Sequence, residues 1–119
     1  MYEAEHEEMQ EAIYTKIVGV SFKGRQELIK TLKEGDILEL MREPDNQYDK
    51  NAIMVLKEVG EWSAVHVKQY KQLGYISREL AVDLAEAIDR GMEYGCKISS
   101  VTGGQDGRNF GINIEIRRR

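Results

Sequence analysis

The stretch that decides the fold is Met41–Val55, with the sequence MREPDNQYDKNAIMV. It predicts a strand, a turn and a second strand. The chain's one proline, Pro44, fixes φ and cannot donate to a strand ladder, so the first strand should end there. Asp and Asn side chains on both sides of Tyr48 can bond nearby backbone amides and hold a tight loop. Tyr48 then either packs onto the core as a plug or offers a flat face to a ligand.

Short apolar runs on either side of this stretch predict a mainly β protein. The last one, FGINIEIR, alternates isoleucines with polar residues, which is typical of a half-buried antiparallel strand. The segment Lys68–Gln72 is expected to be a connection before a short strand at residues 73–76. The six main strands are expected at Thr15–Phe22, Ile37–Met41, Ala52–Leu56, Trp62–Val67, Tyr94–Val101 and Phe110–Arg117.

One or two helices complete the pattern. A short helical turn is expected at Arg25–Leu32, and a longer helix at Arg78–Arg90, where Leu80, Leu84 and Ile88 share one face. Ser77 fits the N-cap of that helix and Gly91 its C′ position. Antiparallel strands with a single capping helix predict a small β-barrel or a strongly curved sheet.

Composition limits the class of protein. A length of 119 residues, with 41% hydrophobic and 32% charged residues, predicts one soluble domain. Cys96 is the sole cysteine, so an intramolecular disulfide is excluded, and with two histidines the usual zinc ligand sets are poorly supplied. No apolar run approaches the roughly 18 residues of a membrane span, so we expect no membrane association and a cytoplasmic location.

Charge is distributed unevenly along the chain. Residues 1–15 hold five glutamates and no Lys or Arg, whereas the rest holds 17 basic and 16 acidic residues, a net of +1. We expect residues 1–14 to be an acidic leader, either solvated or masking a basic site, and residues 15–119 to be the domain. A nearly neutral body excludes a protein that coats duplex DNA through charge alone, so a nucleic-acid site would have to be local.

Catalytic and metal patterns are weak. An EF-hand frame that starts at Asp45 puts Lys50 where Gly is required and Leu56 where Glu is required. Cys96 falls in an expected strand, no nucleophile stands beside a base, and the Gly103-Gly104 loop lacks the Lys and the helix of a phosphate-binding loop. We therefore expect no catalytic residues, no metal and no cofactor, and a protein that is not an enzyme.

A few residues have the chemistry of a local nucleic-acid site. Bases can stack on Tyr48 and Phe22, and Arg78 at the start of the helix can meet a phosphate beside free backbone amides. Asp49 would repel phosphates, but its carboxylate can accept a hydrogen bond from a terminal sugar hydroxyl. Phe22 and Tyr75 each fit a core position as well as a site position, and loop asparagines often only cap backbone amides.

The run Arg42–Val55, REPDNQYDKNAIMV, resembles the signature of the HIRAN domain, a small module found alone in bacteria and fused to repair helicases in eukaryotes. Two further segments support the resemblance: Val18–Phe22, VGVSF, matches the family's early Val-Gly strand, and Leu73–Ile76, LGYI, matches its Gly-Tyr/His-Ile step before a helix. The similarity extends over about residues 16–116.

This resemblance implies an OB-like, six-stranded antiparallel β-barrel capped by a helix. It implies binding of single-stranded DNA, with recognition of 3′ ends at damaged or stalled forks. Tyr75 and Arg78 occupy places where the helicase branch has His and Lys, and Ser21 stands where that branch has Arg, which removes a phosphate contact. The residues implied for nucleic-acid binding are Phe22, Asn46, Tyr48, Asp49, Tyr75 and Arg78.

These observations together predict a non-enzymatic module for single-stranded DNA or DNA 3′ ends in DNA repair or replication stress, with a repair helicase or nuclease as partner. The alternative is a protein–protein interaction module whose central loop is only structural. A groove that contains Phe22, Tyr48 and Arg78 would favour DNA. A buried Tyr48 with an exposed apolar patch elsewhere would favour the alternative.

Overall fold

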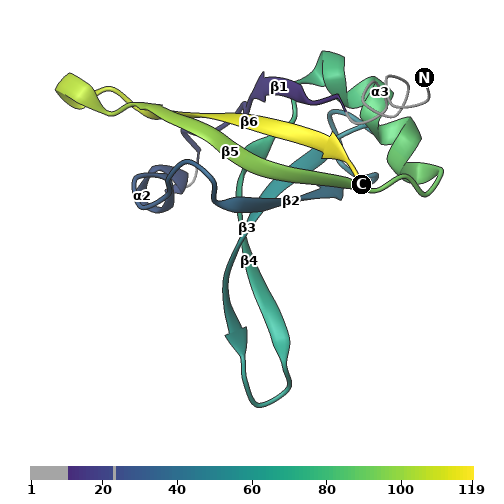
Figure 1. Cartoon of the computed structure of the whole chain (residues 1–119), viewed down its shortest axis with the longest axis horizontal. Helices are drawn as coiled ribbons and strands as arrows, with labels where there is room; N and C mark the ends of the chain where they lie inside the picture. Colours follow the sequence, from purple (N-terminus) through teal and green to yellow (C-terminus); the bar gives the residue numbers. More distant parts are fainter. Residues whose placement is uncertain (1–10, 23) are drawn as a thin grey trace, which may run out of the picture.

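The computed structural model describes residues 11–22 and 24–119. Its six strands form one antiparallel sheet in the order β1-β6-β5-β2-β3-β4, and two helices flank it (Figure 1). The strands are β1 (Ile13–Lys16), β2 (Ile37–Arg42), β3 (Ile53–Trp62), β4 (Val67–Tyr75), β5 (Tyr94–Gly103) and β6 (Phe110–Arg118). The helices are α2 (Arg25–Ile29) and α3 (Arg78–Asp89), and a 3₁₀ turn, η1 (Gln105–Gly107), lies between β5 and β6.

The sheet is open, with β1 and β4 as its edge strands. One bridge joins the two edges: Val18 and Tyr75 exchange two backbone hydrogen bonds of 2.9 Å. The bridge stops there because Gly19, with a φ of 75°, turns the chain out of the extended conformation. Six antiparallel strands are therefore confirmed, whereas the expected closure into a barrel is not found.

Gly74 makes this bridge sterically feasible. A Cβ atom at Gly74 would lie 2.3 Å from the carbonyl oxygen of Val18 and 2.6 Å from the side chain of Ile17. No L side chain fits such a close approach of two backbones, so glycine is required. The Leu-Gly-Tyr-Ile segment therefore reflects a packing constraint at the point where the edges of the sheet meet.

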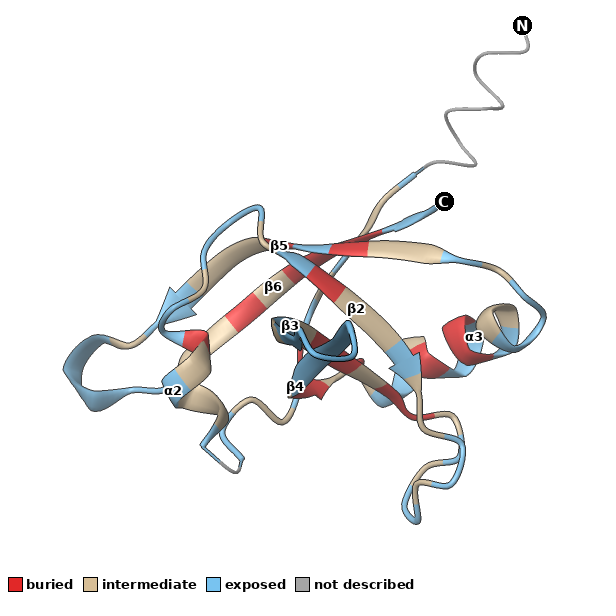
Figure 2. Cartoon of the chain, turned by 90° about the horizontal axis from the view of Figure 1, so that it is seen from below, coloured by how far each residue is buried: buried red, intermediate tan, exposed pale blue. Residues whose placement is uncertain are grey.

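The core is formed by the sheet together with both helices: buried positions lie on the strands, on α3 and on α2 (Figure 2), where Ile29 is fully buried. Ile112, Ile114 and Ile116 are fully buried, as the alternation of the last strand predicts, but Glu115 on the expected polar side is buried as well and pairs with Lys97 and Arg117. The helix also presents the predicted face: Leu84 is buried, as are its neighbours Ala81 and Ala85, while Leu80 and Ile88 pack at the edge of the core. Gly91 ends the helix with a φ of 100°, and Ser77 occupies the N-cap position without a side-chain cap bond.

Two strand assignments were wrong. The strand expected at Thr15–Phe22 begins earlier, at Ile13, and ends at Lys16. The strand expected at Trp62–Val67 is instead the turn between two long strands, and the supposed connection Lys68–Gln72 lies inside β4. Ile53, Val55 and Leu73 are buried where these strands join the body, but the two strands stay paired beyond it, where residues 61–71 have no buried face and their apolar residues give no periodic signal.

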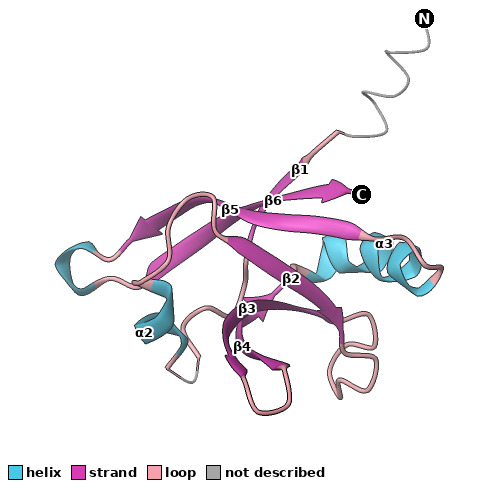
Figure 3. Ribbon diagram, turned by 60° about the horizontal axis from the view of Figure 1, so that its bottom comes forward, coloured by secondary structure: helices cyan, strands magenta, loops and turns pink. Residues whose placement is uncertain are grey.

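The β3–β4 pair extends beyond the body of the protein as a free hairpin, which we call the arm and define as residues 57–71 (Figures 1 and 3). Residues 61–71 are all exposed. The helices lie at opposite ends of the sheet, α2 near the β5–β6 turn and α3 near the start of β5, so neither covers the arm (Figure 3).

Residues 1–10 of the expected acidic leader lie outside the described part of the chain. Ile13 and Tyr14, which the expected boundary assigned to the leader, belong to β1 and pair with Ile116 and Glu115 of β6. Within residues 11–22 and 24–119, no helix is long and apolar enough to cross a membrane.

Candidate functional site

A groove with a volume of about 870 Å³ lies where three segments meet: the chain after β1, the loop of residues 43–52, and the junction between β4 and α3. We call residues 43–52 the groove loop. All six residues expected at the site line this groove. They are Phe22, Asn46, Tyr48, Asp49, Tyr75 and Arg78.

Asn46 holds the groove loop in shape. Its Oδ1 accepts hydrogen bonds from the backbone N–H groups of Tyr48 (2.8 Å) and Asp49 (3.0 Å). Its Nδ2 donates to the Glu43 carboxylate at 2.7 Å, and it lies 3.4 Å from the Tyr75 hydroxyl. Both the oxygen and the nitrogen of the Asn46 side-chain amide are therefore hydrogen-bonded within the protein. Asn46 thereby fixes the backbone positions of Tyr48 and Asp49.

Glu43 joins the groove loop to the end of β4. Its Oε1 accepts the Tyr75 hydroxyl at 2.8 Å as well as the Asn46 amide. These bonds favour the charged form, so the hydrogen bonds from Asn46 and then from Tyr75 lower the pKa of the Glu43 carboxyl below its ordinary value. The Tyr75 ring is half-buried and its hydroxyl is committed to this network.

Arg42 supports the loop from behind. Its guanidinium donates to the backbone carbonyls of Ala52 (2.7 Å) and Lys50 (2.9 Å), and it pairs with Asp89 of α3 at 3.0 Å. Because a planar guanidinium bonds in fixed directions, these contacts tie the loop to the helix. The first residue of the Arg-Glu-Pro segment is therefore structural.

Two aromatic rings are exposed at the groove. The Tyr48 side chain is 80% exposed and that of Phe22 is 60% exposed. The interpretation of Tyr48 as a plug that packs on the core is wrong, because a plug would be buried. The hydrogen bonds of Asn46 fix the loop without help from the tyrosine ring, so the ring stays free to contact a ligand.

Asp49 and Arg78 form the charged end of the site. Asp49 Oδ1 accepts the backbone N–H of Asn51 at 2.9 Å, and its Oδ2 lies 3.5 Å from Arg78 Nε. Arg78 is the first residue of α3, and its Nη2 donates to the backbone carbonyl of Tyr48 at 2.6 Å. The pair places a carboxylate, a guanidinium and a helix N-terminus at one edge of an aromatic surface.

Three charged residues of the groove were not among the predicted site residues: Glu43, Asp45 and Arg25. Arg25 donates to the Gly19 carbonyl at 2.7 Å, and its guanidinium lies 6.0 Å from the centre of the Phe22 ring. Glu43 belongs to the Arg-Glu-Pro segment, which signalled its importance but not its role. Arg25 has no such signal, because its position depends on how the chain turns at Gly19.

Other chemistry is not supported by the geometry. Cys96 is buried, and burial first, then Glu39, raises the pKa of its thiol to about 12, so the reactive thiolate is not formed at neutral pH. Among residues 11–22 and 24–119, no group of three His, Cys, Asp or Glu side chains is arranged to hold a metal ion.

The fold and groove define a small antiparallel β domain with an open groove that exposes two aromatic side chains. The family model for the HIRAN domain matches residues 10–115, and the chain belongs to this family, whose domains bind nucleic acid. The solved HIRAN domain of human HLTF is 23% identical, with a TM-score of 0.62, over 90% of this chain and 74% of that one. A Lactobacillus plantarum protein is 27% identical, with a TM-score of 0.58, over 91% of this chain and 98% of that one.

No curated protein matches this sequence. The family match confirms the resemblance drawn from the Arg42–Val55 segment, and the solved structures share the fold over most of the chain.

Proposed function

We propose that the groove binds single-stranded DNA at a free 3′ end, in DNA repair or replication stress in the cytoplasm. The observation that carries this proposal is the presence, in one groove, of two exposed aromatic faces beside a carboxylate–guanidinium pair. Membership of a nucleic-acid-binding family supports it. A repair helicase or nuclease would be the partner that presents such an end.

Tyr48 stacks on the terminal base in this proposal, with Phe22 beside it. Stacking on an aromatic face contributes about 1–3 kcal/mol per base and tolerates any sequence. Both rings are exposed, and neither has to leave the core to receive a base. Arg25, which lies against the Phe22 ring, adds a positive charge at this side of the groove.

Asp49 accepts a hydrogen bond from the terminal 3′-hydroxyl. The groove contains three carboxylates, of Glu43, Asp45 and Asp49, against the guanidinium groups of Arg25 and Arg78. A strand passing through it would bring several phosphates past these carboxylates, whereas a strand end needs only one or two phosphate contacts. Arg78 and the N-terminus of α3 supply such a contact.

The alternative, a protein–protein interaction module with a purely structural loop, would bury Tyr48. The exposed ring and the groove around it favour the DNA proposal.

The test uses labelled single strands that end in a 3′-hydroxyl or a 3′-phosphate. The parent protein should prefer the 3′-hydroxyl. Tyr48→Ala should weaken binding to both strands by about 1–3 kcal/mol, and Asp49→Asn should reduce the preference by removing the repulsion of the 3′-phosphate. Tyr14→Ala is the matched control, since Tyr14 is 65% exposed and does not line the groove. Equal binding of both strand ends by the parent would refute end recognition.

A further inference from the structure

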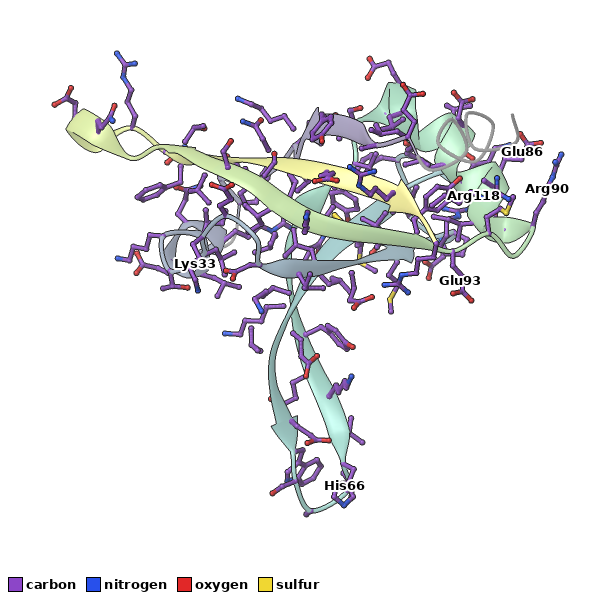
Figure 4. The ribbon with its side chains drawn as sticks, viewed as in Figure 1. Lys33, His66, Glu86, Arg90, Glu93 and Arg118 are labelled. Carbon is purple, nitrogen blue, oxygen red and sulfur yellow. The ribbon has the colours of Figure 1, made fainter. Side chains whose placement is uncertain are left out.

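The arm is a two-stranded ribbon that no other part of the described chain covers. Its strands stay paired from Lys57↔Lys71 to Trp62↔Val67, with one irregularity between Glu58 and Gly60. His66 lies at its far end, well away from the body of the protein (Figure 4). A ribbon of this length buries no core, so its stability comes from cross-strand pairs alone.

The pairing register sorts the charges of the arm onto opposite faces. Residues directly opposite each other point to the same side of a ribbon, and successive pairs alternate. One side, which we call the lysine face, carries Lys57, Gly60, Trp62, Val67, Gln69 and Lys71. The other, the acidic face, carries Glu58, Glu61, Lys68 and Tyr70.

The two faces differ in how their charges are satisfied. On the acidic face, Lys68 pairs with Glu58 at 3.9 Å. On the lysine face, neither Lys57 nor Lys71 pairs with a carboxylate among the described residues. The Lys57 ammonium donates a hydrogen bond of 3.2 Å to the backbone carbonyl of Glu58. The pKa of the Asp36 carboxyl is lowered mainly by the backbone hydrogen bond from Lys33, and the charge of Lys57 adds only weakly to this effect.

Lys57 and Lys71 lie directly opposite each other, and like charges in that position destabilise a ribbon. A polyanion against this face would relieve the repulsion. Farther along the same face, Trp62 and Val67 form an apolar pair at the end of the arm, and the Trp62 side chain is 60% exposed. The face thus combines cations at its base, a flat polar middle at Gly60 and Gln69, and an apolar end.

This combination fits duplex nucleic acid better than a protein surface. The major groove of B-DNA admits a two-stranded β-ribbon, presents acceptors and donors to amide side chains, and offers thymine methyl groups to apolar ones. The carboxylates that phosphates would repel are confined to the opposite face. A purely apolar contact with a protein, or with a second copy of the chain, gives no reason for this separation of charge.

We propose that the lysine face of the arm binds the major groove of a DNA duplex that adjoins the 3′ end held in the groove, which rests on the proposed function. Lys57 and Lys71 contact phosphates, and Trp62, Val67 and Gln69 face the base edges. β4 connects the two sites without interruption, because it begins at the end of the arm and finishes at Tyr75 in the groove. Eight residue steps of about 3.3 Å give a reach of about 26 Å, the length of about eight base pairs.

Binding is measured with three probes: a single strand with a free 3′-hydroxyl, the same strand as the 3′ tail of a short duplex, and that tailed duplex with a 3′-phosphate. The parent protein should bind the tailed duplex more tightly than the single strand. The double variant Lys57→Ala/Lys71→Ala should lose affinity for the tailed duplex on the order of tenfold at low salt, and the slope of log K against log salt should decrease by about two. Its affinity for the single strand should be unchanged.

Lys68→Ala is the matched control, because it removes the same charge from the acidic face of the same arm, and it should leave the advantage of the duplex intact. The double variant should melt no lower than the parent, which shows that lost binding is not lost folding.

The results separate the two proposals. A parent protein that binds the single strand but gains nothing from the duplex overturns the role of the arm and leaves the groove proposal standing. A parent that binds no probe overturns both. A duplex advantage that remains in the double variant also overturns the role of the arm. If the duplex advantage is absent and the protein self-associates in sedimentation, and if Trp62→Ala abolishes this self-association, the end of the arm is a protein contact instead.

Discussion

The groove loop and the arm are adjacent connections of one sheet, and they hold their exposed aromatic residues in opposite ways. In the groove loop, Asn46 and the adjoining Arg42 of β2 bond the backbone, while Glu43 ties the loop to Tyr75 of β4 and Arg42 ties it to α3, so that Tyr48 is exposed on a fixed base. In the arm, Trp62 stands on a ribbon held by its own ladder alone. A fixed loop suits a contact that must discriminate between small chemical groups, whereas a free ribbon suits a contact that adapts to the surface of a large partner.

Two glycines, Gly74 at the Val18–Tyr75 bridge beside the groove and Gly60 in the arm, extend this contrast to the backbone. Gly74→Ala should destabilise the protein by about 3 kcal/mol, because the new Cβ would lie 2.3 Å from the Val18 carbonyl oxygen and force the two edges of the sheet apart. Gly60→Ala, in the arm, has open space around its Cβ and should change the free energy of unfolding by no more than about 0.5 kcal/mol. Urea denaturation of both variants measures the difference. Similar costs at the two positions would contradict the close approach at Gly74.

Asn46 should be the most costly polar side chain of the groove loop to remove. Asn46→Ala leaves the backbone N–H groups of Tyr48 and Asp49 without their acceptor, at a cost of about 2 kcal/mol. The same variant should also lose 3′-end binding, because Tyr48 and Asp49 would no longer be fixed. Gln69→Ala in the arm is the control for stability and should have little effect on unfolding. If Asn46→Ala denatured like the parent, the loop would have to be held by other contacts.

Glu43 makes the stability of the groove dependent on pH. Its hydrogen bonds to Asn46 and Tyr75 lower the folded-state pKa, so its contribution is present above the ordinary value near 4.5 and is lost as pH falls through the lowered pKa. Glu43→Gln should therefore cost about 1 kcal/mol at pH 7, and the difference from the parent should shrink in more acidic solution. Tyr75→Phe removes one of the two donors and should reduce this pH dependence without abolishing it. A difference that stays constant from pH 7 to pH 3 would contradict a charged Glu43 in this network.

The sequence predicted the elements whose signal is local. The alternation of Ile112, Ile114 and Ile116 and the spacing of Leu84 in its helix follow from periods of two and 3.6 residues, so both were correct. Tyr48 and Asp49 could be singled out because they are adjacent in an unusual polar loop that resembles a known family.

What the sequence did not predict depends on contacts between distant segments. Tyr75 reaches Glu43 across 32 residues, because its pairing with Met54 of β3 and the bridge to Val18 fix the end of β4. The arm has no buried face, so the residues from Trp62 to Gln72 show no periodicity, and their pairing is set by register alone. The same register determines which charges share a face, and that information is invisible until the strands are aligned.

Removal of the arm should have the smallest effect on the fold and is the strictest test of the comparison. Glu58 and Tyr70 lie directly opposite each other, so residues 59–69 can be replaced by Asn-Gly, which favours a two-residue hairpin turn. None of the removed residues is buried, so thermal melting should change by only a few degrees. The shortened protein should still prefer a 3′-hydroxyl to a 3′-phosphate, since every residue that lines the groove remains. Loss of that preference in a folded protein would mean that the arm and the groove act as one site, and that the independence argued from their separate hydrogen bonding is wrong.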